Sequence, residues 1–290
     1  MATKGLFKKN VNRSVAGNIA VFLFVLALAV FMLLPLVFAV NSAFKPLDEI
    51  FIFPPRLFVH RPTLDNFIQL GLVTGTFWIP LSKYVFNSIF VSVTATLGHL
   101  ILCSMAAYPL AKLPFVGKSF VNALIRISLL FTSAAILIPQ YIVMSQLHIV
   151  NTYGAYIFPA FQTSLGLYLL QNFMSQIPTE MLEAARMDGA GELRIYWSIV
   201  MPNVKPAWLT AAIFAFNSIW NTSGTTMVSN LVYDEKIKML SSLFSQVTAG
   251  GTARACAGAA LGLLLMIPPV TLFIVSQSRI LETMSTSGMK

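Results

Sequence analysis

Acidic side chains are scarce in this chain and gather in one segment. Residues 176–205, QIPTEMLEAARMDGAGELRIYWSIVMPNVK, hold four of the ten Asp and Glu residues together with three basic residues. The four acids are Glu180, Glu183, Asp188 and Glu192. Carboxylates form charge-assisted hydrogen bonds with Arg and Lys, so this segment is suited to bind a basic surface of another protein.

Residue types that perform catalysis or hold metals form no recognisable site. Cys103 and Cys256 lie far apart in apolar stretches, so neither a disulfide framework nor a CxxC metal site is predicted. The sequence has no GxxxxGK[ST] phosphate loop, so any ATP chemistry must belong to a partner. We therefore predict that the chain is not an enzyme and that it holds no cofactor and no metal.

The composition indicates a membrane protein. Of the 290 residues, 57% are hydrophobic and only 10% are charged, whereas about 25% charged residues is usual in a soluble domain. A water-soluble enzyme is thereby excluded. The formal charge of +9 is typical of a membrane chain, because such chains collect Lys and Arg in their cytoplasmic loops.

Five stretches without Asp, Glu, Lys or Arg predict the membrane spans. A helix needs about 20 apolar residues to cross the hydrocarbon core. One stretch has 53 residues and is long enough for two spans, divided near His148–Thr152. We therefore predict an all-α membrane protein with six transmembrane helices. The stretches are 14–44, 84–111, 127–179, 206–233 and 255–278.

The distribution of Lys and Arg predicts that both termini are cytoplasmic. With the N-terminus inside, twelve basic residues lie in cytoplasmic segments and seven outside, as the positive-inside rule requires. These residues are not interleaved with stacking aromatics, which excludes nucleic-acid binding. A cleaved signal is the alternative for the first span, but its apolar core of 22 residues exceeds the length of about 7–15 that such signals have.

The predicted organisation has two parts. Residues 1–82 comprise a cytoplasmic N-terminus, the first span and an external segment. Residues 83–290 form a five-helix core with the polar loop, at 176–206, and a C-terminal tail. The external stretch 45–83 is rich in proline and aromatics, and it is either an ordered cap or a plain connector.

The spans contain no obvious source of energy for transport. None has a carboxylate, Lys or Arg near its middle, although a proton-driven carrier generally needs such groups. His99 and His148 are more simply neutral residues bonded to a neighbouring helix or to interfacial water. We expect the energy to come from another subunit. A self-sufficient secondary carrier, coupled to sodium through backbone carbonyls, is the alternative.

The polar loop has the pattern of two short helices joined by a sharp turn. Pro178 suits the first helical position and Glu180 the first turn. Gly189 is expected to end the first helix because glycine enters the left-handed conformation without steric cost. The first helix is thus a rod of about eleven residues, and the second runs over 192–200 before Pro202 and Pro206.

The side chains of the first helix predict an apolar face and a polar face. Glu183 and Arg186 are spaced to pair at i,i+3, and the adjacent alanines allow another protein to approach the backbone closely. The apolar face comprises Met181, Leu182, Ala184 and Ala185.

Several stretches resemble the integral-membrane permeases of bacterial binding-protein-dependent ABC importers. EAARMDGAG followed by IVMPNVKP resembles the EAA loop of that family. FKPLDEIFIFPPRLF, NSIFVSVTAT, AAYPLAKLPFVGKSF, FNSIWN and the terminal SGMK resemble its maltose-type carbohydrate branch. The resemblance runs from Asn41 onward, and it implies the type I ABC importer permease fold.

The resemblance also implies partners. In such permeases the EAA segment forms a coupling helix in a groove of the ATP-binding subunit. The implied contact residues here are Glu183, Ala184, Ala185, Asp188, Gly189 and Ala190. The resemblance implies an assembly in the lipid of a bacterial cell membrane. The implied partners are a homologous second permease, two ATP-binding subunits that bind ATP and Mg, an extracytoplasmic solute-binding protein and a carbohydrate substrate. The tail 285–290 resembles family tails that reach toward the ATPase.

Neutral polar and aromatic residues of the fifth span are candidates for the transport path. Asn217 and Asn221 are i,i+4 neighbours, and Trp220 lies on an adjoining strip of the same helix. Amides suit sugar hydroxyls, and an aromatic ring suits the apolar face of a sugar ring. The alternative is that these side chains bond to neighbouring helices and brace the bundle.

Residues beside prolines in the third and fourth spans are further candidates. Gln140 and Tyr141 follow Pro139, and Gln162 lies near Pro159. A proline inside a span frees backbone groups that a neighbour or a cavity must satisfy. These three polar residues are therefore predicted to line the path, although the partner permease could make most of the sugar contacts.

Overall fold

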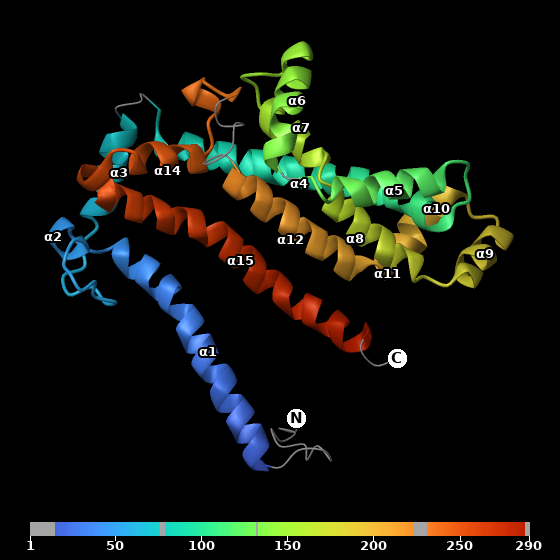
Figure 1. The fold of residues 1–290 in the computed structure, drawn as a ribbon, viewed down its shortest axis with the longest axis horizontal. Coiled ribbons are helices and arrows are strands. Elements are labelled where there is room, and N and C mark those ends of the chain that lie inside the picture. Colours follow the sequence, from blue (N-terminus) through green and yellow to red (C-terminus); the bar gives the residue numbers. More distant parts are fainter. Residues whose placement is uncertain (1–14, 76–78, 132, 223–230, 288–290) are drawn as a thin grey trace.

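The computed structural model describes residues 15–75, 79–131, 133–222 and 231–287, and the regular structure in these ranges is helical (Figure 1). The predicted all-α class is confirmed over the described residues. Three stretches there are long and apolar enough to cross a membrane: Gly17–Ser42, Leu81–Lys112 and Gly251–Gln277. A fourth follows if Glu192–Asn203 and Lys205–Asn221, which meet at 80°, form one span.

Helix α1 (Val15–Ser42) is apolar on all sides and stands apart along most of its length (Figure 1). Its main contact with another long helix is with α15 (Ala255–Ser287). The side chains of Phe31 and Met32 are 69% and 70% exposed. A helix that is hydrophobic all round needs lipid or another protein around it, so the rest of this chain does not supply the cover that α1 requires.

Helix α4 (Leu81–Lys112) is the centre of the fold. Helices α7 (Gly154–Phe161), α8 (Ser164–Ser175) and α12 (Lys205–Thr222) pack along it. Its buried face mixes small polar and apolar side chains, as expected where helices associate without a strong hydrophobic drive between them. This helix therefore connects the elements that line both candidate sites.

Two glycines let neighbouring helices approach α4 closely. A Cβ added to Gly98 would lie 2.6 Å from Cε1 of Phe161. A Cβ added to Gly166 would lie 2.3 Å from Nε2 of His99. No side chain larger than hydrogen fits at either position without displacing an aromatic or imidazole ring, so both glycines are packing requirements of the fold.

The predicted fourth span is divided. The expected break at His148–Thr152 is present, because α6 (Ser133–Gln146) ends before it and α7 begins after it. A further break at Gln162 and Thr163 separates α7 from α8, and α5 (Lys118–Ser128) is separate from α6. The expectation of one continuous helix per span is wrong here. Near Gln162, Pro159 disturbs the helix and the Thr163 hydroxyl bonds back to the carbonyl of Ala160 at 3.2 Å.

The stretch between α1 and α4 is an ordered structure built around buried charged side chains. It contains α2 (Leu47–Ile50) and α3 (Asp65–Gly75). Lys45 and Glu49 are only 2% and 4% exposed. The Glu49 carboxylate accepts hydrogen bonds from the backbone N–H groups of His60 and Arg61, both at 3.1 Å. The described part of 45–83 is thus folded and is not a loose connector.

The bonds to Glu49 have an electrostatic consequence. The backbone N–H of His60, with a weaker contribution from that of Arg61, holds the pKa of the Glu49 carboxyl below its usual range despite the opposing effect of burial. The ionised form of Glu49 therefore helps to hold this segment in its folded shape.

The C-terminal part of the fold packs against α12. The short helix η2 (Glu235–Ile237) leads to α14 (Leu240–Thr248), and η3 (Gly251–Arg254) leads into α15. Helices α12, α14 and α15 share a hydrophobic core with α3 and the start of α4. This core lies at the α3 end of the molecule, whereas the polar loop of 176–205 lies at the other end (Figure 1).

Candidate functional site

The first helix of the polar loop is α9 (Thr179–Met187), and local chemistry sets both of its ends. Pro178 precedes it in an extended conformation, and Gly189 follows it with φ of 79°. The N–H of Gly189 bonds to the carbonyl of Arg186, and that of Ala190 to the carbonyl of Ala185, both at 3.0 Å. This pair of bonds is the Schellman motif that a left-handed glycine makes possible. The helix has nine residues rather than about eleven, since Pro178 lies just outside it.

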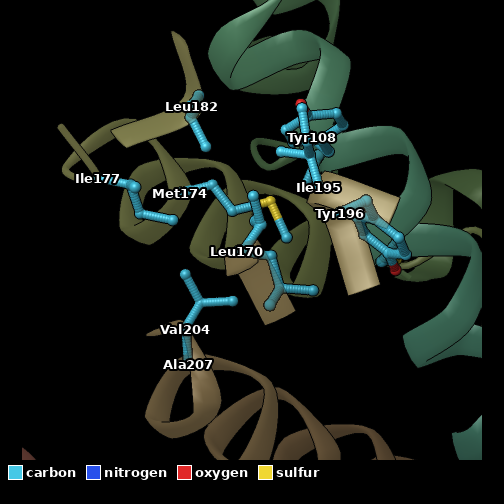
Figure 2. Packing of buried hydrophobic residues seen from close by; sticks show 12 residues of the cluster. Tyr108, Leu170, Met174, Ile177, Leu182, Ile195, Tyr196, Val204 and Ala207 are labelled. Atoms are coloured by element: carbon cyan, nitrogen blue, oxygen red, sulfur yellow. The ribbon is translucent and has the colours of Figure 1, made fainter. Parts of the chain in front are cut away.

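Leu182 anchors α9 to the body of the protein. Its side chain is 1% exposed and packs in a core that also contains Tyr108 of α4 and Met174 of α8 (Figure 2). Ile195 and Val204 belong to the same core. The core therefore joins α9 to α4, α8 and the start of α12 through packed side chains.

The second part of the loop is three consecutive helical pieces rather than one regular helix. These are α10 (Glu192–Ile195), the π-helical η1 (Tyr196–Val200) and α11 (Met201–Asn203). The predicted element over 192–200 is thus present, but its last five residues adopt the wider π geometry. After Val204 the chain turns by 80° into α12. Pro202 and the π-helical turn are the local features that accompany this bend.

A polar network braces the loop against α4. Nε of Arg186 lies 2.8 Å from Oε1 of Glu192, and the hydroxyl of Tyr108 donates to the other oxygen of that carboxylate. The hydroxyls of Tyr196 and Ser104 are 2.6 Å apart. The predicted pairing of Arg186 with Glu183 is therefore wrong, because the sharp turn at Gly189 brings Glu192 to Arg186 instead.

The residues predicted to contact an ATP-binding subunit divide into two groups. Glu183, Ala184, Asp188 and Gly189 are exposed. Ala185 and Ala190 are half-buried and pack against the core around Leu182. Within the described part of the chain, Glu183 takes part in no ion pair. The outward side of α9 thus presents an unpaired carboxylate beside small residues.

Apolar side chains near the loop were missed by the sequence reasoning. Met187 is 89% exposed and Leu193 is 70% exposed. Trp197 of η1 is also exposed. Hydrophobic side chains of this size at a loop surface indicate a contact surface. Their signal in the sequence was weak, because Leu193 and Trp197 lie on a stretch whose buried and exposed faces depend on the π-helical turn.

A second candidate site is a cavity of about 530 Å³ between α4, α6, α7, α8 and α12. Gln140, Tyr141 and Gln162 line it, so the structure brings together the three residues predicted from the third and fourth spans. Nε2 of Gln162 donates to Oε1 of Gln140 at 3.3 Å. The volume lies within the range of about 300–1,000 Å³ typical of sites for small organic molecules.

His99 and Thr163 form a polar corner of this cavity that the sequence did not identify. The imidazole of His99 is 1% exposed, and its nitrogens lie 3.2 and 3.3 Å from Oγ1 of Thr163. Its nitrogens are also within 3.5 and 3.6 Å of the Cys103 sulfur. The prediction that His99 bonds to a neighbouring helix is confirmed, and this contact also places a hydroxyl at the cavity wall.

The residues predicted on the fifth span do not line this cavity. The ring of Trp220 is 2% exposed, stacks on Phe216 and donates its Nε1–H to the carbonyl of Leu265 at 2.9 Å. Nδ2 of Asn221 donates to the carbonyl of Asn217 within the same helix. Asn221 borders a separate groove with α14 and α15. Ser218, on the next side of α12, is the polar residue that reaches the cavity.

The segment 231–240 forms one wall of the cavity and is held by hydrogen bonds to α4 and to the α6–α7 connection. Leu231 and Met239 line the cavity. Nδ2 of Asn87 donates to the carbonyls of Lys236 and Lys238 at 2.8 and 3.0 Å. Oδ1 of Asn151 accepts from the N–H groups of residues 233 and 234 at 3.1 and 2.8 Å. These bonds fix the wall in place in this conformation.

Among the described residues, no group of three His, Cys, Asp or Glu side chains is arranged to hold a metal ion. The described polar groups around the cavity are hydroxyls, amides and an imidazole. They can exchange hydrogen bonds with a polar ligand.

Comparison with known proteins assigns the chain to a family. Residues 5–284 match the family described as the binding-protein-dependent transport system inner membrane component. The chain belongs to this family. The arabinooligosaccharides transport system permease protein AraQ of Halalkalibacterium halodurans is 32% identical over 206 residues, which are 69% of this chain and 70% of that protein. The chain is thus related to sugar ABC transporter permeases, which are transport subunits and not enzymes.

Solved structures show the same fold for this binding-protein-dependent permease. A chain of a bacterial ABC transporter involved in the import of the acidic polysaccharide alginate superposes with a TM-score of 0.76 at 21% identity, covering 93% of this chain and 99% of that one. A chain from the bacterial alginate transporter in complex with an alginate pentasaccharide-bound periplasmic protein gives a TM-score of 0.59 at 13% identity, covering 91% and 96%. The predicted type I importer permease fold is confirmed by the first of these.

Proposed function

We propose that this chain is a permease subunit of an ATP-driven sugar importer, in which it forms part of the translocation path and receives the motion of an ATPase through α9. The observation that carries the proposal is the geometry of α9. Its exposed side presents Glu183 and small residues, while Leu182 on its opposite side is locked in a core shared with α4, α8 and the start of α12.

This arrangement suits mechanical coupling. ATP and Mg bound by two partner subunits would move the groove in which α9 sits, and Glu183 is placed to meet a basic residue there. Because the core around Leu182 is close-packed, α9 cannot shift without moving the elements that contact it. The cavity lies between α4, α8 and α12, so the same displacement changes the walls of the proposed sugar path.

The proposed topology has six membrane crossings, with both termini and α9 on the cytoplasmic side of a bacterial cell membrane. In Figure 1 the start of α1 and the end of α15 lie away from α2 and α3. Helix α6 would supply the third crossing, and the divided helices α7 and α8 would supply the fourth. Broken helices are compatible with a membrane where they line a cavity, as they do here.

The proposed assembly contains a homologous second permease, two ATP-binding subunits and an extracytoplasmic solute-binding protein. The exposed apolar surface of α1 supports a permease partner, because this chain leaves that surface uncovered. The alginate transporter, which was solved in complex with an alginate pentasaccharide-bound periplasmic protein, supports a binding-protein partner. Within the path we propose contacts from Gln140, Tyr141 and Gln162, which line the cavity.

Charge reversal at Glu183 tests this function. In the complete transporter reconstituted in proteoliposomes, Glu183→Lys should abolish solute-stimulated ATP hydrolysis while the permease pair remains assembled. Asp65→Lys is the matched control, since Asp65 is an exposed acid at the opposite end of the molecule and should leave stimulation unchanged. Full stimulation with Glu183→Lys, or solute accumulation by this chain alone under an ion gradient, would contradict the proposal.

A further inference from the structure

The cavity between α4, α6, α7, α8 and α12 contains no charged side chain among the described residues that line it. The sequence supports the same conclusion for the neighbouring residues, because no Asp, Glu, Lys or Arg occurs between 127 and 179 or between 206 and 233. The cavity is nevertheless polar in part, with amides at Gln140 and Gln162 and hydroxyls at Thr163 and Ser218.

An ionised ligand and a neutral polar ligand differ in the free energy of entering this cavity. An ionised carboxylate or phosphate loses much of its hydration on entry, and no described cation in the wall compensates for that loss. A sugar hydroxyl exchanges its bonds to water for bonds to neutral amides and hydroxyls, which costs little. The wall therefore favours a neutral polyhydroxylated ligand over an anion of similar size.

The two glutamines are placed to make this selection. Their side chains come from different elements, α6 and the α7–α8 break, and meet with Nε2 of Gln162 at 3.3 Å from Oε1 of Gln140. Gln162 is exposed and Gln140 is half-buried, and the distance is at the long end for such a bond. A ligand hydroxyl can therefore replace the contact, because it can donate to one amide oxygen and accept from the other amide nitrogen.

Aromatic rings supply the remaining part of a sugar site. Tyr141 on α6 and Phe214 on α12 both line the cavity, and both are about half exposed, at 48% and 55%. They come from different helices, so the cavity can contact the apolar face of a sugar ring and the hydroxyls along its edge at the same time. This combination of aromatic surface and a few polar groups is typical of small-molecule sites.

We propose that this cavity binds the uncharged rings of a neutral glycan and that Gln140 and Gln162 are the residues that discriminate against uronic acids. The inference rests on the proposed function, since it names the substrate class of the proposed path. It assigns the discrimination to this chain rather than to the solute-binding protein alone.

Transport by the reconstituted complex is the first test. Proteoliposomes containing the complete transporter are supplied with ATP and with either neutral oligosaccharides or oligogalacturonates of two to five rings. Uptake of neutral compounds only is the expected result. Uptake of an oligogalacturonate at the rate of the best neutral compound overturns the inference and leaves the proposed function standing. If ATP drives uptake of neither class, the proposed function fails as well.

Ligand protection ties the result to this cavity. Gln162→Cys should react with a maleimide, and a transported neutral oligosaccharide should slow that reaction at least about fivefold. The native cysteines give little background, because Cys103 and Cys256 are 5% and 1% exposed. Asn172→Cys is the matched control, since Asn172 is exposed on α8 outside the cavity and should be labelled without protection. A transported neutral sugar that leaves Gln162→Cys unprotected overturns the inference but not the proposed function.

A charge placed in the wall completes the test. Gln162→Lys should lower the uptake of the neutral compound by about tenfold or more, because hydrogen-bonding sites reject ligands that leave polar groups unpaired. Asn172→Lys should leave uptake unchanged. Assembly of the purified complex serves as the folding readout for both variants. Unchanged neutral uptake by an assembled Gln162→Lys complex overturns the assigned role of Gln162.

Discussion

The loop around α9 and the polar strip of α12 carried similar signals in the sequence, yet the structure uses them differently. In the loop, the predicted turn at Gly189 is present and Glu183 stays on the surface. On α12, Trp220 is buried and bonded to the carbonyl of Leu265. Residues at a helix end follow local backbone chemistry, whereas the orientation of a residue inside a span depends on which helix lies beside it.

Replacing Trp220 should give the largest effect and would sharpen this contrast. Trp220→Ala removes a large buried ring and a hydrogen bond, so the folded state should lose about 3–5 kcal/mol. Thermal unfolding of the purified complex in detergent would measure the loss. Asn221→Leu is the companion variant, and it should change transport without loss of assembly. A stable Trp220→Ala complex with altered transport alone would mean that Trp220 serves the path rather than the packing.

Adding one methyl group between α4 and α8 should have the next largest effect. Gly166→Ala places a Cβ against the imidazole of His99, and such overpacking costs about 1–3 kcal/mol. The displaced His99 should also alter the polar corner at Thr163, so transport should fall. Gly71→Ala on α3 is the control, because nothing lies within 4 Å of its added Cβ. Equal stability of the two variants would show that the helices separate readily at this contact.

A substitution at the turn after α9 tests the loop side of the comparison. Gly189→Ala forces alanine into a left-handed conformation, at a cost of about 1–2 kcal/mol. Because the strain lies next to the proposed ATPase contact, solute-stimulated ATP hydrolysis should drop while cavity labelling at Gln162→Cys persists. Gly191→Ala, two residues on, has ordinary φ of −71° and should retain stimulation. A drop in both variants would argue that the turn conformation is not the cause.

The smallest expected effect is the pH dependence at Glu49. The backbone N–H groups of His60 and Arg61 lower the pKa of Glu49, so its contribution to stability is present above the ordinary pKa of a glutamate. That contribution is lost as the pH falls through the lowered pKa. Both proteins are compared at neutral and at acidic pH. The wild-type protein should lose more thermal stability on acidification than the Glu49→Gln variant, because the variant has no carboxylate to protonate at this position. An identical pH profile in the variant would exclude Glu49 as the titrating group.

Local signals in the sequence were sufficient to predict the limits of α9. Pro178 and Gly189 act on the backbone within a few residues of themselves, so their effect does not depend on the rest of the fold. The pairing of Arg186 depended on more than spacing. The turn at Gly189 brings Glu192 close, and that residue competes successfully with Glu183.

The cavity could be predicted only in part. Prolines marked the neighbourhood of Gln140 and Tyr141 inside α6 and of Gln162 at the α7–α8 break, and these residues do meet in one cavity. The contact between His99 and Thr163 was not predicted, because it joins α4 to the α7–α8 break, far apart in the sequence. Division of the fourth span was also missed, since hydropathy measures apolar length and does not detect a hydroxyl that bonds back to the helix.

The isolation of α1 has a consequence for how the subunit matures. This helix comes early in the chain, and most of its surface finds no neighbour within the polypeptide that follows. Insertion into the bilayer is therefore complete before the helix has a fixed tilt or rotation. In the proposed assembly those two degrees of freedom are settled by the second permease, so the last step in shaping this subunit would be an encounter between chains.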